Sequence, residues 1–198
     1  MITIEDLKDK VKTICESYTQ EPTGGWIMGD GPIPSDILFV GEAPGKTEIQ
    51  MGKPFVGMAG KTFENYLNII GYKRDNVRIT NTCCFRPIQI KTLSNGSPST
   101  SNRAPKISEI ALFKDILDQE ILMTNPKIII TLGNVPLKRL TTFTSIGSCH
   151  GELYVNKDKT RYIFPMYQPS ALTYNRSEEF LKAYEKDWEK LKKTIETF

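Results

Sequence analysis

Residues 37–60 read ILFVGEAPGKTEIQMGKPFVGMAG, and this stretch decides which fold the chain can adopt. Its first four residues are all apolar, as in a short strand buried within a parallel sheet. The chain then enters a turn in which Gly41 and Gly45 let the backbone approach a ligand and Pro44 adds stiffness. The stretch therefore predicts a buried strand followed by a tight turn, which either binds a carbonyl oxygen or anion through backbone N–H groups or has no ligand.

Outside this stretch, short apolar segments alternate with segments of helical period. Two polar stretches, 19–35 and 86–105, are rich in turn-forming residues and are expected to be loops. The alternation predicts an α/β fold, a three-layer sandwich with a central, mostly parallel four-stranded sheet, in a single domain covering residues 1–198. The three further strands are expected at 77–80, 126–132 and 162–166, and the helices at 4–18, 61–70, 107–122, 135–140 and 177–195.

The composition restricts the class of protein without naming a partner. The chain has 198 residues, and its 26 basic and 23 acidic side chains give a net charge of +3, which neither demands nor excludes nucleic acid. No apolar run is long enough to cross a bilayer, and the N-terminus lacks the pattern of a signal peptide. The four cysteines have no C-x-x-C spacing. We therefore expect a monomeric cytoplasmic protein with free thiols and no membrane partner.

A binding site is expected where the strands end. In open parallel sheets, ligands lie beyond the carboxyl ends of the strands, and the segments 41–57, 81–105 and 167–176 leave those ends here. The segment Gly45-Lys46-Thr47 matches the end of a phosphate-binding P-loop, but Val40 stands where that motif needs its first glycine. A nucleotide-binding protein of another class therefore fits only the generic turn.

The segment 41–60 resembles the first motif of family 4 of the uracil-DNA glycosylase superfamily, in which a GE-x-PG turn precedes G-x-PFVG-x-AG. Further segments resemble later parts of that family in the same order. The similarity extends over roughly 35–176, so the ordered set is more specific than the GEAPG turn alone. The later segments are GYKRDNVRITN (71–81), Arg86-Pro87 with Asn102-Arg103-Ala104-Pro105 split by an insertion, Leu132-Gly133, and FPMYQPS (164–170).

The resemblance implies a DNA glycosylase that flips uracil, or a related pyrimidine, and hydrolyses its N-glycosidic bond. It implies that Phe55 stacks on the flipped base, that the Asn81 side chain reads the O4/N3 edge, and that the backbone around Ala43 binds another carbonyl. Glu42, ahead of Glu48, is the expected carboxylate that orients water and stabilises the cationic sugar. Taken singly, Phe55 would be a core residue, Asn81 a turn residue and Glu42 a solvated acid.

The resemblance also implies contacts with DNA. Arg103 and Ser170 are the expected contacts, and Leu172 is either a wedge that fills the space left by the flipped base or a core leucine. The polar insertion at 88–103 is expected to be mobile in the free protein and to lie near the DNA path.

Two departures from the family bear on activity. Family 4 members typically hold a [4Fe–4S] cluster through four cysteines, but here Tyr18 and Phe85 stand at ligand positions and 106–122 contains no cysteine, so no cofactor is expected. The last motif reads Gln168-Pro169-Ser170, with Gln168 where the family has a histidine that donates to uracil O2. A glutamine amide can donate but cannot be cationic. The alternative is thus a weakly active or non-catalytic relative that binds DNA or a modified base.

Overall fold

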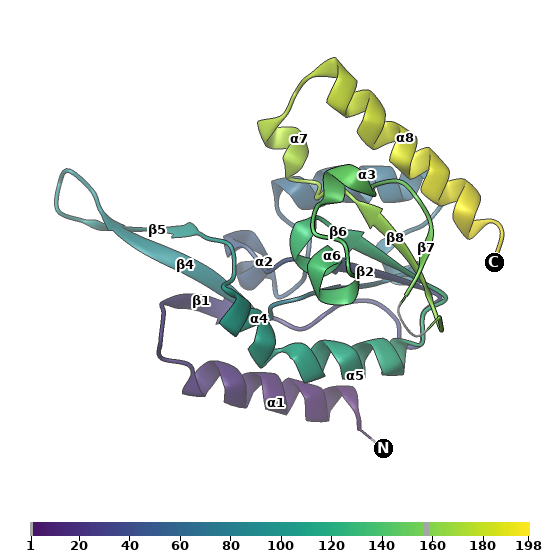
Figure 1. Cartoon of the computed structure of the whole chain (residues 1–198). Helices are drawn as coiled ribbons and strands as arrows, with labels where there is room; N and C mark the ends of the chain where they lie inside the picture. Colours follow the sequence, from purple (N-terminus) through teal and green to yellow (C-terminus); the bar gives the residue numbers. More distant parts are fainter. Residues whose placement is uncertain (1, 157–158) are drawn as a thin grey trace.

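The computed structural model describes residues 2–156 and 159–198, and within them the central sheet has five strands in the order β3-β2-β6-β8-β7 (Figure 1). The fifth strand, β7 (Tyr154–Val155), is antiparallel to β8 and was not predicted, because two residues are too few to show an alternating pattern. The other four strands pair in parallel and confirm the predicted sheet: β2 (Ile37–Gly41), β3 (Arg78–Asn81), β6 (Ile128–Leu132) and β8 (Tyr162–Met166).

Helices cover both faces of this sheet, which confirms the three-layer α/β architecture. Side chains alternate along β2, so that Phe39 packs against Phe63 of α3 and Trp188 of α8, whereas Leu38 lies in the opposite apolar layer with Leu117 of α5. The helices are α1 (Ile4–Ser17), α2 (Lys46–Met51), α3 (Met58–Ile69), α4 (Ile107–Leu112), α5 (Lys114–Thr124), α6 (Asn134–Leu140), α7 (Ala171–Tyr174) and α8 (Glu178–Ile195).

The helix expected at 107–122 is divided into α4 and α5. The break falls at Phe113, whose buried ring packs edge-on against Phe85 with the ring centroids 5.3 Å apart. The short helices α2 and α7 were not predicted, because six and four residues are too few to show a repeating apolar pattern. Across the described parts of the chain, none of the helices combines the length and the apolar character that a bilayer span requires.

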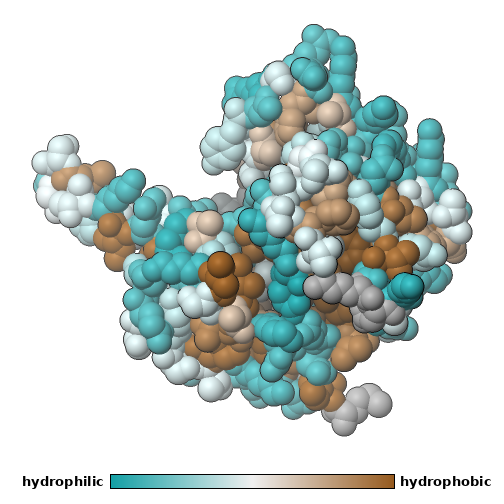
Figure 2. All heavy atoms as spheres, in the orientation of Figure 1, coloured by the Kyte–Doolittle hydropathy of each residue, from teal (hydrophilic) through white to brown (hydrophobic). Residues whose placement is uncertain are grey.

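A second, antiparallel sheet corrects the expectation of loops at 19–35 and 86–105. Its order is β1-β4-β5, and β4 and β5 form a hairpin that stands away from the body of the molecule, as both the ribbon and the space-filling view show (Figure 1 and Figure 2). Both faces of the hairpin meet solvent beyond Ile88, so its sequence shows no apolar alternation. The Asn95-Gly96 pair at its tip is the turn signal that could have predicted it. The strands are β1 (Thr23–Trp26), β4 (Phe85–Thr92) and β5 (Pro98–Asn102).

Candidate active site

A cavity of about 370 Å³ lies at the carboxyl ends of the parallel strands. Its volume is within the range of small-molecule sites, from roughly 300 to 1,000 Å³. Leu172 does not line this cavity and instead packs, partly buried, against the main core. The other residues that the sequence analysis assigned to the site do line it: Glu42, Ala43, Phe55, Asn81, Arg103, Gln168 and Ser170.

Gly41 brings Phe55 and Asn81 together. It is the last residue of β2, and Asn81 stands beside it in the parallel register of β3. A Cβ atom on Gly41 would lie 2.5 Å from Cζ of Phe55 and 2.6 Å from Oδ1 of Asn81, so only glycine leaves room for both side chains. Among the described residues, none hydrogen-bonds to the Asn81 side-chain amide. Its donor and acceptor are therefore available to a ligand.

Phe55 has a left-handed backbone with φ of 52°, which costs a residue with a side chain about 1–2 kcal/mol. Arg74 holds it there, because its Nη1 donates to the Phe55 carbonyl oxygen at 2.9 Å and its Nη2 to the Pro54 carbonyl oxygen at 2.6 Å. Gly60 lies underneath, where a Cβ would be 2.2 Å from the same carbonyl oxygen. The ring packs against Phe63 with centroids 5.3 Å apart. These contacts fix the direction in which Phe55 presents its ring.

The two acids of the first motif have different surroundings. Oε1 of Glu48 accepts the backbone N–H of Val56 at 3.2 Å and that of Gly57 at 2.9 Å, so this carboxylate ties α2 to the Phe55 segment. Glu42 follows β2 directly and is partly buried in the cavity wall, and burial raises the pKa of its carboxyl. Glu42 is therefore the carboxylate that is free to act on a bound molecule.

Gln168 follows β8 and lies against Gly133 at the end of β6. Gly133 has a φ of 90°, and a Cβ there would lie 3.3 Å from Cβ of Gln168. The preceding residue, Tyr167, packs its ring on the His150 imidazole with centroids 4.6 Å apart. Nδ1 of His150 is 2.6 Å from Oδ2 of Asp187 on α8. The chain's only histidine is thus paired with Asp187 and partly buried, and it packs against the residue that precedes Gln168.

Arg103 lines the cavity, but its guanidinium is already engaged. Its Nη1 and Nη2 donate to the two carboxylate oxygens of Glu109 at 2.7 and 2.6 Å, and its Nε donates to the Ile88 carbonyl oxygen at 3.1 Å. Burial raises the pKa of Glu109, but the hydrogen bonds from Arg103, the Lys106 backbone and Tyr18 outweigh it and lower this pKa to about 2. Arg103 therefore fastens the base of the hairpin to α4, and its contact with DNA stays a prediction.

Among the residues that line the cavity without having been assigned to the site, two have polar groups at their side-chain ends and were not singled out from the sequence. Tyr174 of α7 is 87% exposed, and Asn102 ends β5. Oδ1 of Asn102 accepts from Nε of Arg86 at 2.6 Å. Their sequence signals were an aromatic side chain four residues after the Pro-Ser of the last motif and the first residue of the NRAP segment.

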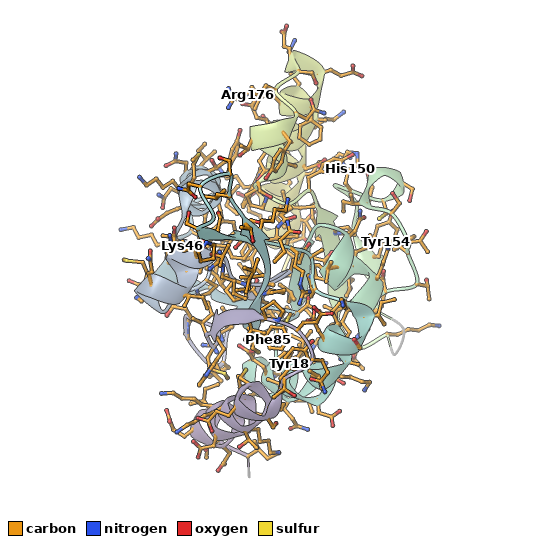
Figure 3. The ribbon with its side chains drawn as sticks, turned by 90° about the vertical axis from the view of Figure 1, so that its left-hand side faces the viewer. Tyr18, Lys46, Phe85, His150, Tyr154 and Arg176 are labelled. Carbon is orange, nitrogen blue, oxygen red and sulfur yellow. The ribbon has the colours of Figure 1, made fainter. Side chains whose placement is uncertain are left out.

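The positions that hold an iron–sulfur cluster in the family are filled here by apolar packing. Tyr18 and Phe85 lie side by side with ring centroids 4.9 Å apart (Figure 3), and Cys15, Cys83 and Cys84 belong to the same apolar cluster. Burial raises the pKa of the Cys15 thiol to about 12 and that of Cys83 further, which disfavours the thiolates that bind iron. Within residues 2–156 and 159–198, no three Cys, His, Asp or Glu side chains are grouped to hold a metal. These residues do not fit an iron–sulfur cluster. Iron analysis of the purified protein tests the expectation that it holds no such cluster.

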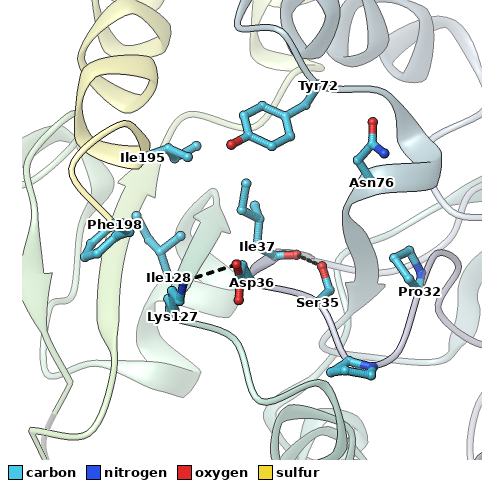
Figure 4. Close-up of a pocket in the computed structure, with 11 residues that line it drawn as sticks. Pro32, Ser35, Asp36, Ile37, Tyr72, Asn76, Lys127, Ile128, Ile195 and Phe198 are labelled. Atoms are coloured by element: carbon cyan, nitrogen blue, oxygen red, sulfur yellow. Dashed lines mark hydrogen bonds and ion pairs between the residues drawn. The ribbon is translucent and has the colours of Figure 1, made fainter.

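A second cavity, of about 470 Å³, lies at the opposite end of the strands, where β2 and β6 begin (Figure 4). Its polar groups pair with one another: Nζ of Lys127 is 3.2 Å from Oδ2 of Asp36, and the Ser35 hydroxyl donates to the Ile37 carbonyl oxygen at 2.9 Å. None of the predicted site residues lines it. The cavity at the carboxyl ends is therefore the candidate active site.

Known proteins resemble this chain over most of its length. The sequence model described as "Uracil DNA glycosylase superfamily" matches residues 28–192. The type-4 uracil-DNA glycosylase of Sulfurisphaera tokodaii is 34% identical, over 97% of this chain and 84% of its own. That of Archaeoglobus fulgidus is 28% identical, over 96% of this chain and 92% of its own. The structure of Pedobacter heparinus SMUG2 covers 96% of this chain at 12% identity, with a TM-score of 0.49. Because the family match includes every element around the cavity, the chain belongs to the uracil-DNA glycosylase superfamily.

Proposed function

We propose that this protein is a monofunctional DNA glycosylase that flips uracil out of DNA and hydrolyses its N-glycosidic bond. The observation that carries the proposal is that Glu42, Phe55, Asn81 and Gln168 line one cavity at the carboxyl ends of the strands. The type-4 uracil-DNA glycosylases of related sequence support the choice of base and polymer. A base must leave the helix stack to enter such a cavity, which is how enzymes reach the glycosidic bond of a nucleotide.

Recognition of the base falls to three groups. The Phe55 ring, held by its backbone contacts, stacks on the flipped pyrimidine. The Asn81 amide offers an acceptor and a donor to the N3/O4 edge, a pattern that fits uracil and mismatches cytosine. The backbone N–H near Ala43, in the turn after β2, binds a further carbonyl oxygen. The close approach of Phe55 and Asn81 over Gly41 supports a shared base site.

Cleavage leaves negative charge on the base and positive charge on the sugar. The ionised Glu42 orients a water molecule toward the sugar and stabilises the developing cation, more strongly in its partly buried position than in bulk water. Gln168 donates from its amide to the O2 atom of the departing base. Because this donor is neutral, we expect slower excision than with a histidine, since loss of one optimal donor typically costs about 10²–10³ in rate.

The remaining predicted residues serve the DNA strand. Ser170, at the start of α7 and in the cavity wall, offers its hydroxyl to a phosphate next to the flipped nucleotide. Leu172 belongs to the same helix, and its packing against the core favours a role in holding α7 over a role as a wedge. The enzyme acts as a monomer.

The direct test is incubation of the purified protein with an end-labelled oligonucleotide that contains one uracil, followed by alkaline cleavage of abasic sites. A labelled fragment at the uracil position supports the proposal, and the same oligonucleotide with thymine is the control. Absence of cleavage, together with tight binding to uracil-containing DNA, would support the non-catalytic alternative that Gln168 favours.

A further inference from the structure

The β4–β5 hairpin is a large exposed feature for which the proposed reaction has no use. Beyond Ile88 its residues are exposed, apart from the half-buried Ser97 and Ser99. It is nevertheless regular: Ile90 stands opposite Thr100, and the tip is closed by the Leu93 N–H, which donates to the Ser97 carbonyl oxygen at 2.8 Å. A two-stranded ribbon without a packing partner is only marginally stable in water, so this one has the character of a surface that meets another molecule.

The base of this hairpin belongs to the wall of the active site. Asn102 and Arg103, at the end of β5, both line the cavity. Asn102 is bound by Arg86 of β4, and Arg103 is bound by the fully buried carboxylate of Glu109. The direction of the arm is therefore fixed relative to the place where the flipped base would lie.

The charges on this side of the molecule suit an anionic polymer. There is no Asp or Glu between residues 82 and 108, and Lys91 is exposed on the arm. Figure 3 faces the side from which the hairpin projects, and it places Lys46 at the left and Arg176 near the top of this side; both residues are exposed. Exposed cations on three separate segments thus lie on the side of the molecule from which the arm projects, outside the cavity itself, whose wall carries Glu42 and Glu48.

The side chains along the arm are suited to contact the sugar–phosphate backbone of a nucleic acid rather than to read its base sequence. Hydroxyl groups donate to phosphate oxygens without reading a base, and a two-stranded ribbon is narrow enough to follow a DNA groove. Two apolar side chains, Ile90 at 58% and Leu93 at 49% exposure, provide contacts for sugars. The hydroxyl-bearing residues are Thr92, Ser94, Ser97, Ser99, Thr100 and Ser101, of which Ser97 already donates its hydroxyl to Oδ1 of Asn95.

We infer that the β4–β5 hairpin is an arm that binds the sugar–phosphate backbone of DNA several nucleotides away from the flipped base. The inference rests on the proposed DNA substrate and adds a second contact region to it. The four steps from Gln89 to Leu93 span about 13 Å at the usual strand rise. That length matches about four nucleotide steps of one DNA strand.

The test compares the full-length protein with two hairpin variants. In one, residues 90–100 are replaced by Asn-Gly, because Gln89 and Ser101 face each other in the register and a two-residue turn can join them. The other is Lys91→Glu, with Lys8→Glu as a control, because Lys8 is exposed on α1, away from the arm, and the substitution changes the net charge equally. Binding is measured by fluorescence anisotropy at several salt concentrations, on duplexes of about three helical turns with and without uracil.

We expect the shortened arm to weaken duplex binding about tenfold, and Lys91→Glu to reduce the slope of log K against log salt by about 0.9 or more. Excision from a single-stranded oligonucleotide of about five nucleotides, too short to reach the arm, should stay unchanged. If both hairpin variants bind the duplex as well as the parent does, the inference is overturned, and an arm that binds another protein would give that result. The inference is also overturned if Lys8→Glu weakens duplex binding as much as Lys91→Glu does. If the shortened chain does not unfold cooperatively, it is not folded well enough for the test. The comparison of Lys91→Glu with Lys8→Glu then decides whether the arm binds DNA. Failure of the parent to excise uracil would overturn the proposed function alone, because binding to the undamaged duplex still reports on the arm.

Discussion

Arg74 donates one hydrogen bond to the carbonyl oxygen of Phe55 and another to that of the residue before it, and so holds a phenylalanine in a left-handed conformation. Lysine cannot reproduce both bonds, because it has no planar pair of donors. Arg74→Lys should therefore lower kcat/KM on uracil-containing DNA about tenfold or more, since small misplacements at a reacting centre are costly. Steady-state kinetics measure this change.

A second, independent change at the same place is Gly60→Ala, whose added Cβ would lie against the same Phe55 carbonyl oxygen. Both variants should lose activity together, and Gly60→Ala should also unfold at a lower temperature than the parent, because its Cβ would overlap backbone atoms of Phe55. Full activity in both would show that the backbone geometry of Phe55 is unimportant to the reaction.

Glu42 should set the acid limb of the pH–rate profile. Burial raises the pKa of its carboxyl, and the proposed reaction uses the ionised form, so activity should fall as the pH drops through a value above the ordinary glutamate pKa of about 4.3. Glu42→Gln should lower kcat about 10²–10³-fold and abolish this limb. Single-turnover rates from acid to neutral pH measure both effects. Glu48→Gln is the matched comparison, and retention of the limb in Glu42→Gln would assign it to another group.

Asn81 should determine which base is accepted. In Asn81→Asp an ionised carboxylate could only accept hydrogen bonds, so action on uracil should fall and preference should move toward cytosine, whose N4 amino group donates. The measurement is excision from matched oligonucleotides that contain either base. Uracil excision equal to that of the parent would mean that Asn81 does not contact the base.

Gln168→His should raise uracil excision. It restores a donor that can carry positive charge when negative charge develops on the base, and the gain should be on the order of tenfold or more if the ring fits beside Gly133. Gln168→Leu, which keeps the size and removes the donor, should be slower than the parent. The histidine prediction fails if both variants are equally slow.

Glu109 should stabilise the fold in a defined pH window. Its folded pKa, about 2, is below the ordinary value, so its contribution is fully present above about pH 4.3 and is lost as the pH falls toward 2. Glu109→Gln should lower the free energy of unfolding by about 3 kcal/mol at neutral pH, because it breaks a buried ion pair, and by much less near pH 3. Urea unfolding at the two pH values measures this difference. Glu21→Gln, which breaks an exposed pair with Lys106, should cost at most about 1 kcal/mol.

The parallel sheet could be predicted because β2, β6 and β8 are short, mainly apolar runs that lie buried in the sheet, whereas β3 reads Arg-Ile-Thr-Asn and is buried without being apolar. The same criterion could not find the β4–β5 hairpin, since its side chains meet solvent on both sides. Its only local signal is the Asn95-Gly96 turn, and the serine-rich sequence around that turn is equally typical of a loop.

The site residues could be predicted where each follows a strand or belongs to the first motif, as Glu42, Phe55 and Asn81 do. The residues that hold them in place could not, because their contacts join distant parts of the chain. Arg74 reaches back to Phe55 across 19 positions, and Asp187 to His150 across 37. Nothing in the local sequence around Arg74 or Asp187 distinguishes these side chains from ordinary surface charges.

The contact between His150 and Asp187 gives the C-terminal helix a part in the active-site framework. Asp187 of α8 holds His150, His150 packs on Tyr167, and Tyr167 precedes Gln168. The same helix contributes Trp188 to the main core. A shortened chain that ends before α8 would therefore lose both a wall of the core and the backing of its last motif. Fusion partners are better attached through a flexible spacer than by extending this helix.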